Sequence, residues 1–362
     1  MPYADELLGR EAVAGLATIL GGDGSLPRLR AVAGTLDGLG FRERVNATRD
    51  AVLEDFPGDL DRLAGPVRAA LRDTRFTGWM TFPITEAVAI RGRDQVEDAL
   101  ALLAELTPRS TAETALRWFL DEHLERCLRI VMEWTTHHDE HVRRLASEGV
   151  RPRLPWAPQA RRLVDDPGPI VPVLDALYRD ESEYVRRSVA NCVNDISRDH
   201  PELAVRIAQG WLAEPDENTA SVVRHALRTL IKRSHAGALA CIGVDARAAI
   251  DVTGPTVRTP VVAMGEELAF DCRITLGGSA RARVAVDYVL HFASARGDER
   301  EKVFKLGIRD LEPGESWDIA RSHRFKPIST RRYYDGDHGL SLQVNGVRTD
   351  RAGFLLIGAG PS

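Results

Sequence analysis

A short segment that begins with valine and arginine recurs in this sequence at intervals of about 40 residues. The copies start at Val142 (VRRLASEGV), Val185 (VRRSVANCVNDI) and Val223 (VRHALRTLIKR). Each is preceded by a segment with apolar residues at helical spacing. A period near 40 residues with two helices per unit is typical of HEAT and armadillo repeats, whose units stack into a solenoid. The repeats therefore predict a HEAT-like α-α solenoid.

After about Ile242 the pattern changes to alternating apolar and polar residues separated by Gly, Pro and Asn-Gly turns. Asn345-Gly346 lies between two such runs and is a signal for a two-residue hairpin. About seven short strands in this region indicate an immunoglobulin-like β-sandwich. We therefore expect a helical-repeat domain over residues 1–242 that carries the site, followed by a β-sandwich domain over residues 243–362.

The composition is that of a globular protein, with 44% hydrophobic residues and a net charge of -5. The sequence shows neither a long apolar run nor a signal peptide, which predicts no membrane span and a cytoplasmic location. Four cysteines are far apart in sequence, and neither they nor the histidines have a metal-ligand spacing. We expect a monomer that uses no metal and no cofactor.

Positive charge is concentrated between His141 and Val164, where six arginines accompany one acid, Glu148. A chain of net negative charge with such a local patch is expected to have an anionic partner. A single carboxylate inside the patch suggests chemistry on that partner.

Aligning the first two valines places Glu148 beside Asn191 and Arg144 beside Arg187. Second helices of a solenoid line its concave surface, so Glu148 and Asp195 are expected in one groove ringed by arginines. The third copy adds Arg224, Arg228 and Lys232. The stiff loop RPRLPW adds Arg151 and Arg153, which we expect to contact phosphates, and Trp156.

Each of these residues also has a purely structural interpretation. Arg144 and Glu148 could be a simple i,i+4 pair, and Asp195 could cap its helix. Glu113 is the fourth residue of Ser110-Thr-Ala-Glu113, a capping-box pattern. Trp156 could seal its loop against the core. These alternatives stay open at the level of the residue pattern.

Several segments form a recognisable set: VRRLASEGVRPRLPWA, SVANCVNDISRDHP, HALRTLIKRSHAGAL and, nearer the ends, FTGWM and TRRYYDGDHGLSLQVNG. As a set they closely resemble the AlkC branch of the AlkC/AlkD family of DNA alkylation-repair glycosylases. The resemblance covers most of the chain. RPRLPW is specific to AlkC-like proteins, whereas VRRSVANxxND is shared more widely.

The resemblance implies binding of double-stranded DNA in the groove and hydrolysis of the N-glycosidic bond of cationic alkylated bases. The substrates would be 3-methyladenine and also 3-methylcytosine, excised without full base flipping. The acidic and aromatic site positions of the family correspond to Glu113, Glu148, Trp156 and Asp195.

Two other functions stay open: a non-catalytic HEAT scaffold with a basic groove, and a catalytically inactive sensor of DNA damage. The sandwich has its own basic cluster, which includes Arg332 and is followed by the aromatic pair Tyr333-Tyr334. We expect Arg332 and Tyr333 to contact DNA, unless Tyr333 packs in the sandwich core.

Overall fold

The structure, a computed structural model, describes residues 4–22, 26–293, 300–327 and 332–359. The chain divides into two compact units, residues 1–226 and 227–362. None of the helices in these ranges is long and apolar enough to span a membrane.

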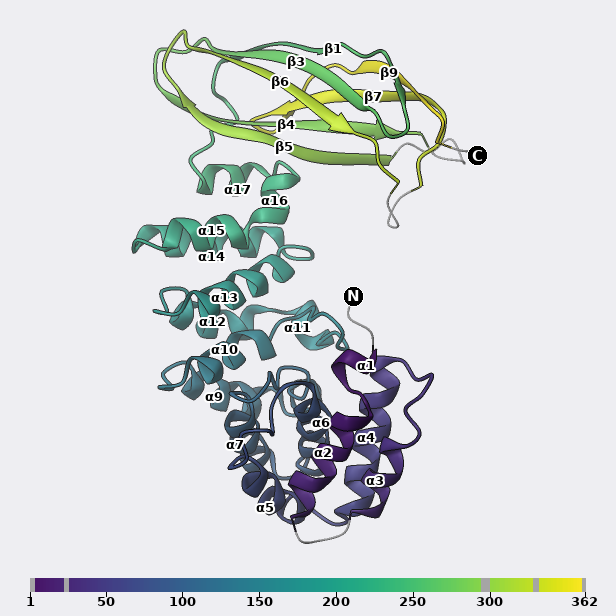
Figure 1. Cartoon of the computed structure of the whole chain (residues 1–362). Coiled ribbons are helices and arrows are strands. Elements are labelled where there is room, and N and C mark those ends of the chain that lie inside the picture. The colour runs from purple at the N-terminus through teal and green to yellow at the C-terminus, as the bar shows by residue number, and fades with distance from the viewer. Residues whose placement is uncertain (1–3, 23–25, 294–299, 328–331, 360–362) are drawn as a thin grey trace. The chain divides into compact units, whose positions relative to one another are not determined.

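The first unit consists of helices joined by turns and loops (Figure 1). They are α1 (Ala4–Leu7), α2 (Arg10–Gly21), α3 (Pro27–Ala33), α4 (Phe41–Asp55), α5 (Leu60–Ala70), η1 (Gly78–Thr81), α6 (Phe82–Arg91), α7 (Val96–Leu106), α8 (Arg117–Glu122), α9 (Leu124–Trp134), α10 (Glu140–Gly149), α11 (Arg161–Asp165), η2 (Gly168–Ile170), α12 (Val171–Leu177), α13 (Glu183–Ile196), α14 (Pro201–Ala213) and α15 (Thr219–Ala226).

The helices that carry the recurrent valine segments stack in sequence order. α10 packs against α13, and α13 packs against α15 (Figure 1). Val142, Val185 and Val223 are all buried. Of the helices that precede them in each repeat, α12 contacts both α9 and α14. The helical-repeat fold predicted from the period is therefore confirmed.

The first helices of consecutive repeats are also joined by specific side-chain contacts. Trp211 on α14 stacks on Tyr178 with ring centres 4.9 Å apart, and its indole Nε1 donates to Asp175 Oδ1 at 2.7 Å. Each contact spans a single repeat. Such contacts between neighbours fix the relative position of consecutive repeats in a solenoid. They thereby also fix the side chains that lie between two repeats.

The second unit begins with two short helices and continues as strands. Its elements are α16 (Arg228–Lys232), α17 (Ala236–Cys241), β1 (Ile250–Val257), β2 (Val261–Ala263), β3 (Glu267–Leu276), β4 (Ala282–Phe292), β5 (Arg300–Leu311), β6 (Ser316–Arg324), β7 (Gly336–Val344), β8 (Val347–Arg348) and β9 (Ala352–Ile357). The last helix ends at Cys241 and the first strand begins at Ile250.

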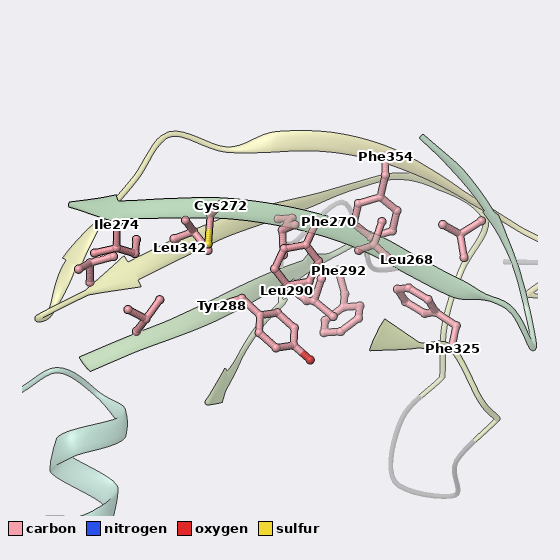
Figure 2. Packing of buried hydrophobic residues seen from close by; sticks show 14 of the residues in the cluster. Leu268, Phe270, Cys272, Ile274, Tyr288, Leu290, Phe292, Phe325, Leu342 and Phe354 are labelled. Atoms are coloured by element: carbon pink, nitrogen blue, oxygen red, sulfur yellow. The ribbon is translucent and has the colours of Figure 1, made fainter. Parts of the chain in front are cut away.

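The strands form two sheets that enclose an apolar core. One sheet has the order β1-β3-β6 and the other β2-β9-β7-β4-β5, with β8 paired to β7. Inward residues of β3 alternate with exposed or half-buried ones, as an antiparallel strand with one buried face requires. Figure 2 shows the packed side chains, among them Phe270, Tyr288 and Phe354.

The hairpin predicted at Asn345-Gly346 is present between β7 and β8, where Val344 pairs with Val347. Both turn residues have positive φ, 46° for Asn345 and 90° for Gly346, as a type I′ turn requires. The side chain of Asn345 is buried and accepts a hydrogen bond from the Ala285 amide at 2.7 Å. The turn is therefore tied into the sheet.

Candidate functional site

A buried network of ion pairs links two consecutive repeats of the first unit. Glu148 lies in the last turn of α10 and Asp195 in the last turn of α13, and they are 5% and 3% exposed. Arg151, in the loop after α10, donates to both carboxylates. Its Nη1 lies 2.5 Å from Glu148 Oε1, and its Nε lies 2.8 Å from Asp195 Oδ2. The two acids expected in one groove therefore share one guanidinium.

A pair of serines lies at the other carboxylate oxygen of Glu148, and one of them donates to it. Ser188 Oγ donates to Glu148 Oε2 at 2.7 Å, and Ser147 Oγ hydrogen-bonds Ser188 Oγ at 2.7 Å. Arg144 Nη2 lies 3.4 Å from Glu148 Oε1. Because both oxygens have charged or hydroxyl donors, this carboxylate has a fixed position and needs no rearrangement to act on a nearby charge.

Glu113 joins the network through Arg144. Its Oε2 accepts from Arg144 Nη1 at 2.9 Å, and the guanidinium carbon of Arg144 lies 4.9 Å from the centre of the Tyr184 ring. The capping-box interpretation of Glu113 is wrong, because α8 begins only at Arg117 and Glu113 lies in the preceding turn. The residue is instead a partner of Arg144.

Burial determines the protonation behaviour of two of these acids. It raises the pKa of the Glu113 carboxyl, although Arg144 opposes the shift, and it raises the pKa of the Asp195 carboxyl, although Arg151 opposes it. Both carboxyls therefore take up a proton at a higher pH than exposed carboxyls do. The charged form of the network is correspondingly lost early on acidification.

Trp156 is presented to solvent rather than packed inside. It is 61% exposed and has a φ of 62°. Its ring centre lies 6.2 Å from that of Trp79 and 6.3 Å from that of Phe41, both in the N-terminal part of the unit. The alternative in which Trp156 seals its loop against the core is therefore contradicted.

A groove runs along the second helices of the repeats. One hollow of about 430 Å³ is lined by Glu148, Tyr184 and their neighbours, and an adjacent hollow of about 440 Å³ extends to Asn218 and His225. Both are lined by Glu183 and Arg187, so they are parts of one groove. Glu148 lines this groove. Asp195 and Arg151 line neither hollow, and Asp195 is connected to Glu148 through Arg151.

The residues expected to contact DNA differ in their exposure to solvent and in the unit to which they belong. Arg187 and Arg224 are exposed on α13 and α15, and Asn191 is half-buried with its Oδ1 3.0 Å from His225 Nε2. Arg228 and Lys232 are exposed on α16 and belong to the second unit.

Two arginines expected to point outward do not. The expectation that Arg151 extends from its loop is wrong, because its side chain is buried and donates to two carboxylates. Arg144 is half-buried in the network described above. Arg153 remains partly exposed and pairs with Asp199 at 2.9 Å.

In the sandwich, the expectation for Tyr333 is also wrong. Its ring is buried in the core between Phe292 and Phe325, with ring centres 5.7 Å and 5.5 Å away. Arg332 is exposed and lies over the Tyr334 ring at 5.5 Å. Tyr333 therefore serves packing, and only its neighbours present polar groups to solvent.

Sequence reasoning missed several residues of this region. Ser188 and Tyr184 are two of them. They lie one helical turn apart on α13, and both line the same hollow as Glu148. Glu86 was also missed; it is buried on α6 and accepts from Arg42 at 2.7 and 2.9 Å. A signal for it existed, since one acid interrupts the apolar run FPITEAVAI.

The chain is similar to known proteins in both sequence and structure. Residues 251–358 match a family described as "Uncharacterised protein YhaZ, C-terminal Ig-like domain". Protein YhaZ of Bacillus subtilis is 37% identical over 79% of this chain and 80% of its own length. The alkylpurine DNA glycosylase AlkC of Pseudomonas fluorescens, solved bound to DNA containing an abasic-site analogue, is 31% identical. Its TM-score is 0.85, over 99% of this chain and 100% of that chain.

Proposed function

Because the chain belongs to the family of YhaZ and AlkC, we propose that it is a DNA glycosylase that excises alkylated bases from double-stranded DNA in base excision repair. The proposed substrates are cationic bases, 3-methyladenine and also 3-methylcytosine, removed without full base flipping. The observation that carries the proposal is the groove-facing carboxylate of Glu148, held by Arg151 and Ser188.

The chemistry needs few groups. The alkylated base already carries positive charge, so it leaves without a general acid. The N-glycosidic bond breaks with its electron pair passing to the ring nitrogen, and the water oxygen bonds to the sugar carbon. A fixed carboxylate stabilises the oxocarbenium-like sugar and accepts the proton of the attacking water.

The proposed roles follow from position. Glu148 lines the groove and is assigned to the sugar and the water. Glu113 and Asp195 hold Arg144 and Arg151, which in turn hold Glu148. The exposed indole of Trp156 is suited to a cationic base or sugar, an attraction worth about 0.5–2 kcal/mol.

The decisive experiment is base release from DNA treated with a methylating agent. We expect the purified protein to release free base at the same rate with and without a chelator, because no metal-ligand spacing is present in the sequence. Loss of release on chelation would contradict the metal-free mechanism. Binding of methylated DNA with no release would favour the damage-sensor alternative instead.

The rate of release should fall on acidification. Glu113 and Asp195 have raised pKa values, so each loses its charge as the pH falls through a value above the usual 4.5 or 3.8. We expect the acid limb of the single-turnover rate to begin at a higher pH than these ordinary carboxyl values. A rate that stays constant down to pH 4.5, measured while the protein remains folded, would contradict a role for the charged network.

Binding along the groove should depend on Arg187. Replacing the exposed Arg187 by methionine should weaken binding to damaged and undamaged DNA alike, and lower the salt slope by about one ion contact. The matched control is Arg206→Met, since Arg206 is also exposed but lies on α14 and does not line the groove. Equal effects of both substitutions would contradict the proposed path of the DNA.

A further inference from the structure

Beside the proposed catalytic network lies a buried arginine without a hydrogen-bond partner. Arg117, the first residue of α8, is 5% exposed. Within the described part of the chain, nothing accepts a hydrogen bond from its Nε, Nη1 or Nη2. Burial lowers the pKa of Arg117 to about 10, so the guanidinium still carries its charge at neutral pH. A buried cation without acceptors is costly, which makes this position conspicuous.

The same arginine lines a cavity of about 200 Å³ in the first unit. Thr114 lines it too, and the buried Oγ1 of Thr114 likewise has no partner among the described residues. Two independent groups with unmet hydrogen-bonding capacity therefore share one cavity. Unsatisfied polar groups that converge on a cavity are typical of a site that a ligand completes.

The charges around the cavity restrict the ligand. Arg42 pairs with Glu86 at 2.7 Å, and Arg93 pairs with Glu122 at 3.0 Å. The other two charged groups in the lining are the Arg117 guanidinium and the Asp121 carboxylate. The lining is thus balanced, with donors at Arg117 and Thr114 and an acceptor at Asp121. A small anion would meet three carboxylates there, and a cation would meet three guanidinium groups.

The remaining walls are aromatic. Trp118 and the exposed Trp156 both line the cavity. Indole faces stack on planar heterocycles. A volume of about 200 Å³ is below the range of about 300–1,000 Å³ typical of drug-sized ligands, which suits one heterocyclic ring system. A nucleobase has this shape and carries donors and acceptors on its edge.

We infer that this cavity binds an uncharged free nucleobase, the product of excision, through Arg117, Thr114 and the two indoles. The inference rests on the proposed function. The bound alkylated base is cationic, whereas cleavage passes an electron pair to its ring nitrogen and leaves it neutral. The charge-balanced cavity therefore suits the product better than the substrate. Trp156 contributes both to the proposed catalytic set and to this cavity.

The test is titration calorimetry of the full chain with free 3-methyladenine, with free adenine and inorganic phosphate as separate probes. We expect saturable binding of the free bases and none of phosphate. Thr114→Val removes one hydroxyl with little change of shape, and Arg117→Met removes the guanidinium. Each should weaken base binding by about tenfold or more. The matched control is Thr48→Val, because Thr48 Oγ1 is also buried without a partner but does not line the cavity.

The outcomes are separable from those of the base-release assay. Base binding that Thr114→Val weakens and Thr48→Val preserves supports a base-binding cavity. If methylated DNA releases no base, the proposed function fails, and with it only the identification of that base as an excision product. Base affinity unchanged in both cavity variants overturns it, as does the absence of saturable base binding. Phosphate binding that depends on Arg117 would also overturn it in favour of an anion site.

Discussion

Replacing Arg151 by methionine should destabilise the first unit by about 3–5 kcal/mol and abolish base release, because it leaves two buried carboxylates without their shared partner. The free energy of unfolding would be measured by urea denaturation. The deficit should shrink as the pH falls, since protonation of Asp195, whose pKa burial raises, removes part of the uncompensated charge.

The same loop supplies the control. Arg153 lies two residues away, across Pro152, and pairs with Asp199 at a partly exposed position. Arg153→Met should change the free energy of unfolding by about 0–1 kcal/mol. If both substitutions were equally mild, the buried pairing of Arg151 would be refuted.

Replacing Glu148 by glutamine should lower the single-turnover rate of base release by about 10²-fold or more, a typical loss for one electrostatic or acid–base element. Glutamine keeps the shape but has no charge for the sugar. The protein should also lose stability, because an amide replaces an oxygen that accepts from Arg151 or Ser188.

Glu183→Gln is the control for charge in the same groove. Glu183 lines both hollows with Arg187 but is exposed at the start of α13. We expect its rate to stay within a few-fold of the original. Methylated-DNA binding should be preserved in Glu148→Gln, so that the loss is one of rate. A near-normal rate for a folded Glu148→Gln would place the chemistry elsewhere.

Periodicity was sufficient to predict the solenoid and the alignment of its repeats. Each repeat must bury the same row of apolar side chains against its neighbour. Val142, Val185 and Val223 therefore appear in the sequence at equivalent positions. That alignment also brought Glu148 and Asp195 to neighbouring helices. The turn at Asn345-Gly346 was predictable for a local reason, since few residues adopt positive φ.

The direction of individual side chains was not predictable in the same way. Arg151 follows the end of α10, where helical spacing no longer determines which way a residue points. Its second partner, Asp195, belongs to the next repeat. Polar side chains are ordinarily expected to face solvent, whereas Glu148 and Asp195 are buried. Arg151 donates to both carboxylates, and Ser188 also donates to Glu148. The position of Tyr333 could not be predicted either, because a tyrosine side chain can pack in a core or contact nucleic acid at a surface.

The backbone of Trp156 has a consequence for how this protein can evolve. A φ of 62° in a bulky residue costs about 1–3 kcal/mol, and 61% exposure means that burial of the ring returns little of it. Selection for folding alone would favour glycine or asparagine at this position. The proposed role of Trp156 would explain an aromatic residue there: the loop would keep a less stable backbone so that an indole faces the solvent.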